Sequence, residues 1–578
     1  MGTHASNNVI LSLLALTFFL SVAFLYIFGL GGTGLFDIYE ARTAQISAEA
    51  ATTNAAGTSP ELMGAPYLKT PPLIHYAQSL SYQIFGVTPF AARLPSALAA
   101  FIMVFVLYNS LWLLTGARRF SLLAAGVFAL SPGVVLAARL ATPTALFMLL
   151  TLAATFMLIG NIYHNERSYL RLFVAGLVLG LAFLAGGVFA FVFAFFVAFL
   201  LAALKDHRGY NFASLAPFSV LIASFLAVFP WAIAVLKTKG LEGLKAYVMA
   251  FSGIDALTFD FSYGTWWHVL AVAGLLTLPW SLFPLPALLP NIRRLSALRG
   301  YDPRTGLPAL ALVWLLLGGL LAVLAGVSGL MWSVWLAVPV AILVADFFDR
   351  LPEASLSWLW AAVIFAGVLG ISALFFWLPQ MAEILSGDGT FKGLSGLLDS
   401  AGLTGYLSSP FWQAVLQVKT DWGVTLIMAG GTFLVALVGG VYLMRHGALE
   451  GAAFVFVGVW FVLFMGTQSM AGNVYDHLQE PLKWMSVKIK KEHQLALEVR
   501  PDVKEPVKVV LYGIQRPSVA FSSGISYRLA DSARKAFSGV RPLFVITDVR
   551  HISALEEHIP AGTGYECIGG YCLVELYK

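Results

Sequence analysis

Long runs of apolar residues, separated by short polar segments, occupy most of this 578-residue chain. A helix needs about 20 apolar residues to cross the hydrocarbon core of a bilayer. We interpret thirteen such runs as membrane-spanning helices, which predicts an α-helical integral membrane protein. Their approximate ranges are 8–30, 91–115, 119–137, 142–161, 170–185, 188–204, 214–236, 266–290, 307–327, 333–348, 356–378, 423–444 and 450–467.

Three segments between these runs, at 31–90, 237–265 and 379–422, are long enough to build structure outside the membrane. The first is expected to hold two helices that lie along the membrane surface. One covers about 38–54. The other begins after Pro71 and Pro72, because proline suits the first turn of a helix, and it ends near Phe85.

The pattern changes after residue 470, where apolar runs shorten and polar residues alternate with them. An amphipathic helix is expected over 474–496, followed by alternating strands and helices that predict a small α/β domain. We therefore divide the chain into a membrane domain, 1–470, and a soluble domain, 471–578. Strands are predicted at 507–512, 518–522 and 543–547, a short helix at 551–558, and a terminal hairpin over 567–577.

Composition supports this division. Hydrophobic residues make up 59% of the chain and charged residues 11%, with a mean hydropathy of +0.81. These values exclude soluble, disordered and collagen-like proteins. Residues 471–578 carry 26 of the 65 charged side chains in under a fifth of the length. The net charge of +5 gives no reason to expect nucleic-acid binding.

The positions of Lys and Arg predict the orientation, because cytoplasmic loops are enriched in both. They recur in alternate loops, which places the N-terminus in the cytoplasm and, after thirteen spans, the C-terminal domain in the periplasm. No Asp, Glu or Lys is expected within the hydrocarbon core, which argues against a transporter. The basic loops contain Arg118 and Arg119, Arg167 and Arg171, Lys205 and Arg208, Arg293 to Arg304, Arg350, and Arg445.

Only two cysteines are present, which excludes a fold built on disulfides. Cys567 and Cys572 lie five positions apart on the predicted oxidising side, so a disulfide across the terminal hairpin is expected. Two cysteines without clustered histidines fall short of a zinc site, and no metal is predicted.

One motif is specific enough to indicate a family. Tyr67, Lys69, Pro71 and Pro72 are followed by Phe85-Gly86 and by the run 93–96, Arg-Leu-Pro-Ser. This pattern resembles the polyprenyl-phosphate-dependent glycosyltransferases of the GT-C fold, in particular the lipid A aminoarabinose transferases and the protein O-mannosyltransferase-like proteins of glycosyltransferase family 39. Weaker similarities lie at 39–42, 138–143, 279–281 and 512–521.

The resemblance implies an enzyme of the bacterial inner membrane, acting in the cell envelope on lipopolysaccharide or a similar acceptor. It would transfer a sugar from a polyprenyl phosphate, such as undecaprenyl phosphate, to a lipid or glycan on the periplasmic face. The expected partners are membrane lipid, the carrier-linked sugar as donor substrate, and the acceptor, with no other cofactor. The alternative is a homologue that has lost catalysis and acts as a carrier-binding or scaffold subunit.

Such chemistry needs a carboxylate for the acceptor hydroxyl and cations for the donor phosphate. The matched motifs supply Glu40, and beside it Asp37, as base candidates. Asp37 could equally cap the helix that follows it. Lys69, Arg139 and Arg93 are the phosphate-binding candidates. The secondary candidates are Tyr39, Arg42 and His75. For Arg42 and His75 a structural role is the favoured interpretation, one as a pairing partner in the loop and the other as an interfacial hydrogen-bonding group.

Four positions depart from the family pattern. The family has an acid before Glu40, where this chain has Tyr39, and an acid at the position of Thr144. It has a lysine at the position of Gly186, and often a basic residue in 329–331, where there is none. These departures are the reason for keeping the non-catalytic alternative.

Overall fold

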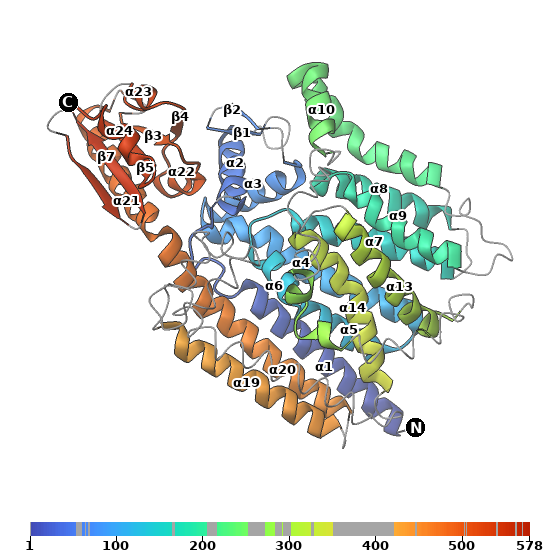
Figure 1. Cartoon of the computed structure of the whole chain (residues 1–578). Helices are drawn as coiled ribbons and strands as arrows, with labels where there is room; N and C mark the ends of the chain where they lie inside the picture. The colour runs from blue at the N-terminus through green and yellow to red at the C-terminus, as the bar shows by residue number, and fades with distance from the viewer. Residues whose placement is uncertain are drawn as a thin grey trace.

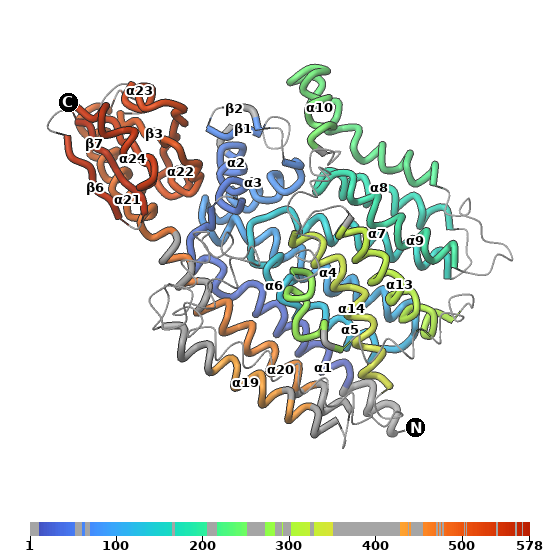
Figure 2. Tube along the Cα trace, viewed as in Figure 1, coloured from blue at the N-terminus to red at the C-terminus, as the bar shows by residue number. Residues whose placement is uncertain are grey.

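The computed structural model is largely helical, with a small sheet at the C-terminal end (Figure 1). The predicted span 356–378, residues 379–420 of the predicted outer segment 379–422, and Lys69 lie outside the described residues. Figure 2 traces the same view with the remaining segments in grey. The structure describes residues 2–37, 39–53, 60–63, 65–67, 70–163, 168–204, 217–251, 272–283, 292, 302–324, 329–350, 421–444, 448–501, 503, 506–538, 542–560, 563–568 and 570–577.

Among the described residues, six helices are long and apolar enough to cross a membrane, or seven if one bent pair counts as a span. The protein is therefore a multi-pass membrane protein, while the predicted number of thirteen spans stays a prediction. The helices of this part are α1 (Gly2–Ile27), α4 (Pro89–Thr115), α5 (Arg118–Ala129), α6 (Pro132–Arg139), α7 (Thr144–Tyr163), α8 (Tyr169–Gly186), α9 (Phe189–Leu204), α10 (Pro217–Phe251), η4 (Trp280–Leu282), α13 (Pro303–Leu324), α14 (Leu330–Arg350), α19 (Asp421–Met444), α20 (Ala448–Met465) and the π-helical turn η6 (Gly466–Met470).

The bent pair corresponds to a predicted single span, 119–137. Helices α5 and α6 meet there at 64°. Pro132 opens α6, where its missing N–H group costs nothing, and it cannot continue α5. The bend brings the last residue of α6, Arg139, back to the end of α1.

Small residues allow close helix packing on one side of the membrane part. A Cβ atom added to Gly176 or Gly180 of α8 would lie 2.5 or 2.4 Å from a backbone oxygen of α10. Ser224 of α10 also donates a hydrogen bond from its hydroxyl to the Gly176 carbonyl, at 2.8 Å. Two glycines four positions apart form the kind of face that lets membrane helices approach closely.

The acid nearest to a predicted membrane core is Asp346, which lies inside the predicted span 333–348. It is buried in the last turn of α14 and is paired with Arg350 one turn further on. The expectation of no Asp, Glu or Lys within the predicted spans is therefore wrong at this position, where the acid has a cationic partner one turn away.

The segment 31–90 has a helix at each of the two predicted positions, while their placement along the membrane surface stays a prediction. Helix α2 (Tyr39–Thr53) and helix α3 (Leu73–Phe85) pack against each other, and Pro72 stands at the N-cap of α3. A short antiparallel ribbon lies between them, formed by β1 (Glu61–Leu62) and β2 (Ala65–Pro66).

After η6 the chain continues as α21 (Ala471–Val499) into a unit with one five-stranded sheet, in the order β4-β3-β5-β7-β6. Strand β3 is parallel to both β4 and β5, and the last two strands are antiparallel. Leu482, Met485 and Ile489 of α21 are buried against the sheet. The other elements are β3 (Lys508–Tyr512), α22 (Pro517–Ser523), β4 (Tyr527–Ala530), α23 (Ala533–Ala536), β5 (Leu543–Asp548), α24 (Ile552–Glu556), β6 (Tyr565–Ile568) and β7 (Tyr571–Leu576).

The predicted strand at 518–522 is wrong, because this segment is helix α22. Pro517 occupies its first turn, and Gly524 ends it in the left-handed conformation that glycine adopts without strain. The strand that follows β3 is instead β4, which the sequence pattern did not reveal. In the terminal hairpin, Cys567 and Cys572 face each other across β6 and β7 and form a disulfide bond.

Candidate functional site

Four of the predicted site residues gather where α1 ends and where the C-terminal unit meets the segment 31–90. Contributions come from the loop after α1, the first turn of α2, the first turns of α4 and the last residue of α6. The short connection after α1 and the bend between α5 and α6 bring these distant segments together.

Glu40 and Arg93 form a buried ion pair, and each side chain is 3% exposed. Arg93 donates from Nε to Glu40 Oε1 at 2.7 Å and from a terminal nitrogen to Oε2 at 2.9 Å. The two parallel bonds are the geometry for which a guanidinium and a carboxylate are matched.

The remaining hydrogen-bonding capacity of this pair goes to the backbone. Glu40 also accepts hydrogen bonds from the backbone N–H groups of Phe36 and Ala141, each at 2.9 Å. Arg93 donates to the carbonyl oxygens of the loop after α1, at 2.6 to 2.9 Å. The pair therefore joins the first loop, α2, α4 and the segment after α6. The carbonyl acceptors are those of Leu30, Thr33 and Gly34.

Arg139 lies beside this pair and is half-buried. One terminal nitrogen of its guanidinium donates to the carbonyl oxygens of Leu25 and Phe28, at 2.7 and 2.8 Å. Gln468 of η6 donates to the Phe28 carbonyl as well, at 3.2 Å. These bonds supply donors to backbone carbonyl groups at the C-terminal end of α1, which lack partners within the helix. A positive charge is also favourable at this end of a helix.

Asp37 connects the first loop to the C-terminal unit. Its carboxylate accepts hydrogen bonds from the Ser518 backbone N–H, at 3.0 Å, and from the Ser518 hydroxyl. Its backbone N–H donates to the side-chain carbonyl of Gln479 of α21, while the amide nitrogen of Gln479 donates to the Leu35 carbonyl at 2.7 Å. Burial raises the pKa of Asp37 from 3.8 to about 6, against the opposing effects of Ser518 and Arg516.

Arg516 is held beside this junction by Tyr571. Its Nε donates to the Tyr571 hydroxyl at 2.9 Å, and its guanidinium lies 5.5 Å from the centroid of the same ring. The loop that carries Arg516 also borders a groove of about 380 Å³ at the carboxyl ends of β3 and β4. The polar residues of that groove include Gln515, Asp531 and His551.

His75 is fully buried between α2 and α3 in a chain of hydrogen bonds. Its Nδ1 lies 2.7 Å from the Ser47 hydroxyl and its Nε2 lies 2.9 Å from the Thr70 hydroxyl. Ser47 also contacts the Gln78 side-chain oxygen at 2.6 Å. Burial lowers the pKa of His75 from 6.5 to about 4, so the ring is neutral at pH 7 and positions the two helices.

Tyr39 and Arg42 lie on the outer side of α2. Tyr39 is 75% exposed, and the Arg42 guanidinium stacks between its ring, at 5.3 Å, and the ring of Tyr67, at 5.7 Å. The position where the resembling family has its first acid thus carries an exposed aromatic ring that contacts a cation.

Gly186 is packed directly against an aromatic ring. A Cβ atom at this position would lie 2.1 Å from the Phe147 ring, which is itself buried. A lysine, as the family has here, could be accommodated only if Phe147 moved. Thr144 is the first residue of α7, the helix that carries Phe147.

The structure therefore brings together Glu40, Arg93, Arg139 and Asp37. It places His75, Arg42 and Tyr39 on the neighbouring surface helices. Sequence reasoning missed Gln479 and the contact of Ser518 with Asp37. The family similarity at 512–521 is the one signal in the sequence that points to Ser518. Among the described residues, no three His, Cys, Asp or Glu side chains are grouped so that they could hold a metal ion.

The chain is similar to several known proteins. Residues 69–233 match the family model described as dolichyl-phosphate-mannose-protein mannosyltransferase. The undecaprenyl phosphate-alpha-4-amino-4-deoxy-L-arabinose arabinosyl transferase of Pectobacterium carotovorum subsp. carotovorum (strain PC1) is 25% identical over 433 residues, which cover 72% of this chain and 74% of that protein.

Two crystal structures of ArnT from Cupriavidus metallidurans, one bound to undecaprenyl phosphate and one in the apo state, each match with a TM-score of 0.70. They are 14% and 15% identical in sequence, and the match covers 99% of this chain and 98% of theirs. The resemblance to GT-C glycosyltransferases is thereby confirmed, and the chain has the ArnT fold.

Proposed function

We propose that this protein is a membrane glycosyltransferase that takes its sugar from an undecaprenyl-phosphate-type carrier and transfers it to a lipid or glycan acceptor. The observation that carries the proposal is the ArnT fold along nearly the whole chain, together with the charged residues gathered at the end of α1. We place this end at the periplasmic face, with the N-terminus in the cytoplasm.

In this proposal Arg139 binds the donor phosphate. It is half-buried, and only one of its three guanidinium nitrogens is bonded to described residues. A guanidinium that retains donors at a partly exposed position is well suited to a phosphate, which becomes the leaving group. Lys69 is proposed as a second phosphate ligand from the family motif, and Arg93 as the residue that fixes Glu40.

Of the two base candidates, Asp37 is the better proton acceptor. Both oxygens of Glu40 already accept two hydrogen bonds each, so we propose that Glu40 positions the loop. The pKa of Asp37, about 6, lies nearer to neutrality, where a general base is most effective. Ser518 covers this carboxylate, so access of the acceptor would require the C-terminal unit to shift.

Two further observations favour a second candidate function, carrier binding without transfer. Glu40 has no hydrogen-bonding capacity left for a substrate, and Phe147 fills the space beside Gly186 where the resembling enzymes have a lysine. A protein with this site would keep the fold and the phosphate-binding arginine but lack the full set of acids and cations.

The test uses the full-length protein in liposomes that contain carrier-linked sugars and acceptor lipids extracted from bacterial membranes. Wild type is compared with Asp37→Asn, Glu40→Gln, Arg139→Gln and the exposed control Glu242→Gln. Loss of a general base typically lowers the rate by about 10²–10⁴-fold, so Asp37→Asn is expected to abolish most transfer. Binding of undecaprenyl phosphate is measured in parallel by native mass spectrometry.

Each outcome is informative. Transfer that is lost in Asp37→Asn, with carrier binding intact, supports the transferase and the role of Asp37. Unchanged transfer by that variant would refute the role of Asp37 alone. Carrier binding by wild type without transfer selects the second candidate, and absence of both would overturn both functions.

A further inference from the structure

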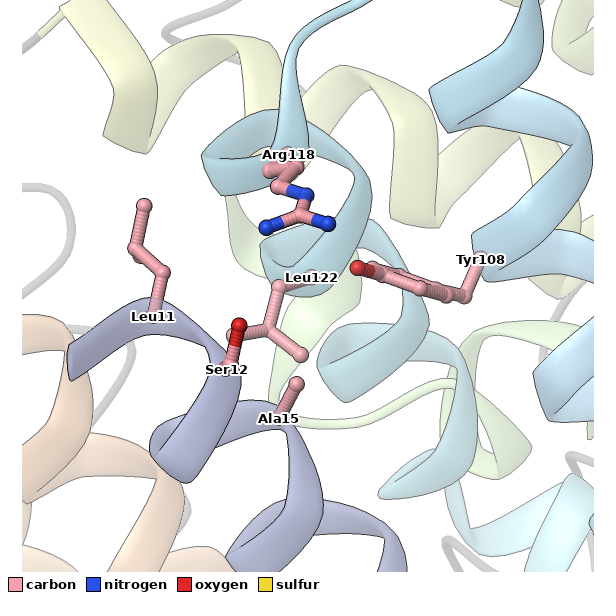
Figure 3. Close-up of a pocket in the computed structure, with 6 residues that line it drawn as sticks. All are labelled: Leu11, Ser12, Ala15, Tyr108, Arg118 and Leu122. Carbon is pink, nitrogen blue, oxygen red and sulfur yellow. The ribbon is translucent and has the colours of Figure 1, made fainter. Parts of the chain in front are cut away.

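A second polar site lies beside the middle of α1, away from its C-terminal end. A pocket of about 160 Å³ is enclosed by α1, α4 and α5, and its walls include Ser12, Tyr108 and Arg118 (Figure 3). Ser12 precedes Leu25, whose carbonyl contacts Arg139, by thirteen helical residues, which is about 20 Å along the axis. This pocket is therefore separate from the candidate site described above.

Three hydrogen-bonding side chains converge on this pocket. Figure 3 shows the Arg118 guanidinium and the Tyr108 hydroxyl pointing towards the same space, with the Ser12 hydroxyl on the opposite wall. The other lining residues, Leu11, Ala15 and Leu122, are apolar. The Arg118 guanidinium and the Tyr108 hydroxyl both donate hydrogen bonds, so the pocket is suited to an acceptor that carries negative charge.

Arg118 differs from the arginine next to it. Arg119 lies 3.5 Å from the Asp349 carboxylate, which Arg304 also contacts at 3.1 Å. Within the described part of the chain, Arg118 has no carboxylate within 4.0 Å; its guanidinium instead lies 4.4 Å from the centroid of the Trp112 ring. Stacking on an aromatic face holds the guanidinium plane and leaves its edge donors available to an anion.

The size of the pocket fits a phosphate group. A single water needs only about 10–15 Å³ of such space, so 160 Å³ is ample for one phosphorus and its oxygens. Tetrahedral phosphate oxygens can accept from the Arg118 guanidinium and the Tyr108 hydroxyl at once, and bonds to a charged donor are the stronger kind.

The apolar side chains beside the pocket indicate that a phosphate bound there would belong to a lipid. Leu13 and Leu16 of α1 are 58% and 57% exposed, and Phe105, one turn from Tyr108 on α4, is 50% exposed. In a membrane protein, such side chains face acyl chains. A polar pocket that opens beside an apolar helix surface is the arrangement expected for a headgroup whose chains lie along the protein.

We propose that the Arg118 pocket binds the phosphate group of an anionic phospholipid, in the leaflet opposite to the C-terminal unit. The sequence predicts that this face is cytoplasmic, because Arg118 and Arg119 lie in one of its basic loops. The proposal does not depend on glycosyl transfer, since the pocket shares no residue with the proposed donor site.

The experiment measures binding of phosphatidylglycerol and phosphatidylcholine to the purified full-length protein by native mass spectrometry. Wild type is compared with Arg118→Ala, Arg118→Lys and Tyr108→Phe. Arg304→Gln is the matched control, because it removes the same charge from the same face without lining the pocket. Loss of a charge-assisted bond predicts that Arg118→Ala weakens phosphatidylglycerol binding about 10- to 100-fold. Tyr108→Phe is expected to weaken it several-fold, and Arg304→Gln to leave it unchanged.

Thermal unfolding in lipid-free detergent checks that each variant is folded. Equal binding by wild type and a folded Arg118→Ala would overturn the proposal, and so would an equal loss in Arg304→Gln. Inorganic phosphate is added as a competitor, to distinguish a site for a phospholipid headgroup from a site for free phosphate. If millimolar phosphate displaced the lipid completely, the pocket would be a phosphate site and the lipid assignment would fail. Carrier binding and sugar transfer are also measured for Arg118→Ala and are expected to persist. The lipid site and the proposed function can then fail separately.

Discussion

Glu40 and Asp37 lie three residues apart on the same outer segment, yet their environments are opposite. Glu40 is paired with a buried arginine and two backbone N–H groups, so its charge is fully balanced inside the membrane part. Asp37 faces the C-terminal unit, where its partners are a serine hydroxyl and a backbone N–H, and burial raises its pKa to about 6. One carboxylate holds helices together, while the other lies at a junction between two units and can gain or lose a proton near neutral pH.

The difference shows that proximity to a motif does not determine the role of an acid. What matters is which cation or donor the fold brings to it, because a saturated carboxylate is a poor base and an incompletely balanced one is a better base. Three substitutions test this comparison.

The largest effect is expected for Arg93→Ala. Removal of one partner from a buried ion pair typically costs about 3–5 kcal/mol, since the other charge remains buried without compensation. Arg93→Lys should recover little of this, because a lysine cannot make the paired bonds to Glu40 and also reach the loop carbonyls. Thermal unfolding in detergent measures the loss, with Lys245→Ala, in an exposed ion pair, as the control. Equal stability of Arg93→Ala and the control would contradict the structural role of the pair.

A smaller loss is expected for Gly34→Ala, in the loop that precedes the two carboxylates. The Gly34 carbonyl accepts a bond from Arg93 at 2.6 Å, and a Cβ atom at this position would lie 1.9 Å from the Tyr475 hydroxyl oxygen. Overpacking of this kind costs about 1–3 kcal/mol. The control is Gly431→Ala in α19, where no atom lies within 4 Å of the added carbon. Unfolding temperatures of the two variants that agree within error would argue against this close contact.

The smallest effect concerns the pH dependence of the Asp37 junction. Because the folded pKa, about 6, exceeds the unfolded value of 3.8, the folded state binds the proton more tightly. The contribution of Asp37 to the free energy of unfolding is therefore complete below about pH 4. It falls by about 1–2 kcal/mol as the pH rises to about 6. Asp37→Asn should remove this slope.

His75 gives the opposite slope, because its folded pKa of about 4 lies below 6.5 and its contribution is lost as the pH falls through that range. The measurement is therefore the difference in unfolding temperature between wild type and Asp37→Asn at each pH. His75 is present in both proteins, so its contribution cancels in this difference. A difference that stays constant from pH 4 to pH 7 would show that Asp37 does not titrate in this window.

Much of the architecture could be predicted from local sequence. Apolar runs of membrane length, Pro72 before α3 and the alternation of short strands after α21 are local signals. They correctly indicated a multi-pass membrane protein, a helix at each of two positions in the segment 31–90, and strands that alternate with helices after α21. The same kind of signal failed at 518–522, where a short apolar run fits a strand or a helix equally well, and Pro517 with Gly524 decided for the helix. The bend between α5 and α6 was likewise hidden inside one apolar run.

The sequence by itself determined which residue types gather at the end of α1, since Glu40, Arg93 and Arg139 all lie in matched motifs. Only the tertiary structure decided what each of them does. Arg93 lies 53 residues from Glu40, Arg139 contacts carbonyls more than 100 residues away, and Ser518 lies 481 residues from Asp37. The pKa and the hydrogen-bonding capacity of a carboxylate depend on such partners and on burial, which arise only when distant segments pack together.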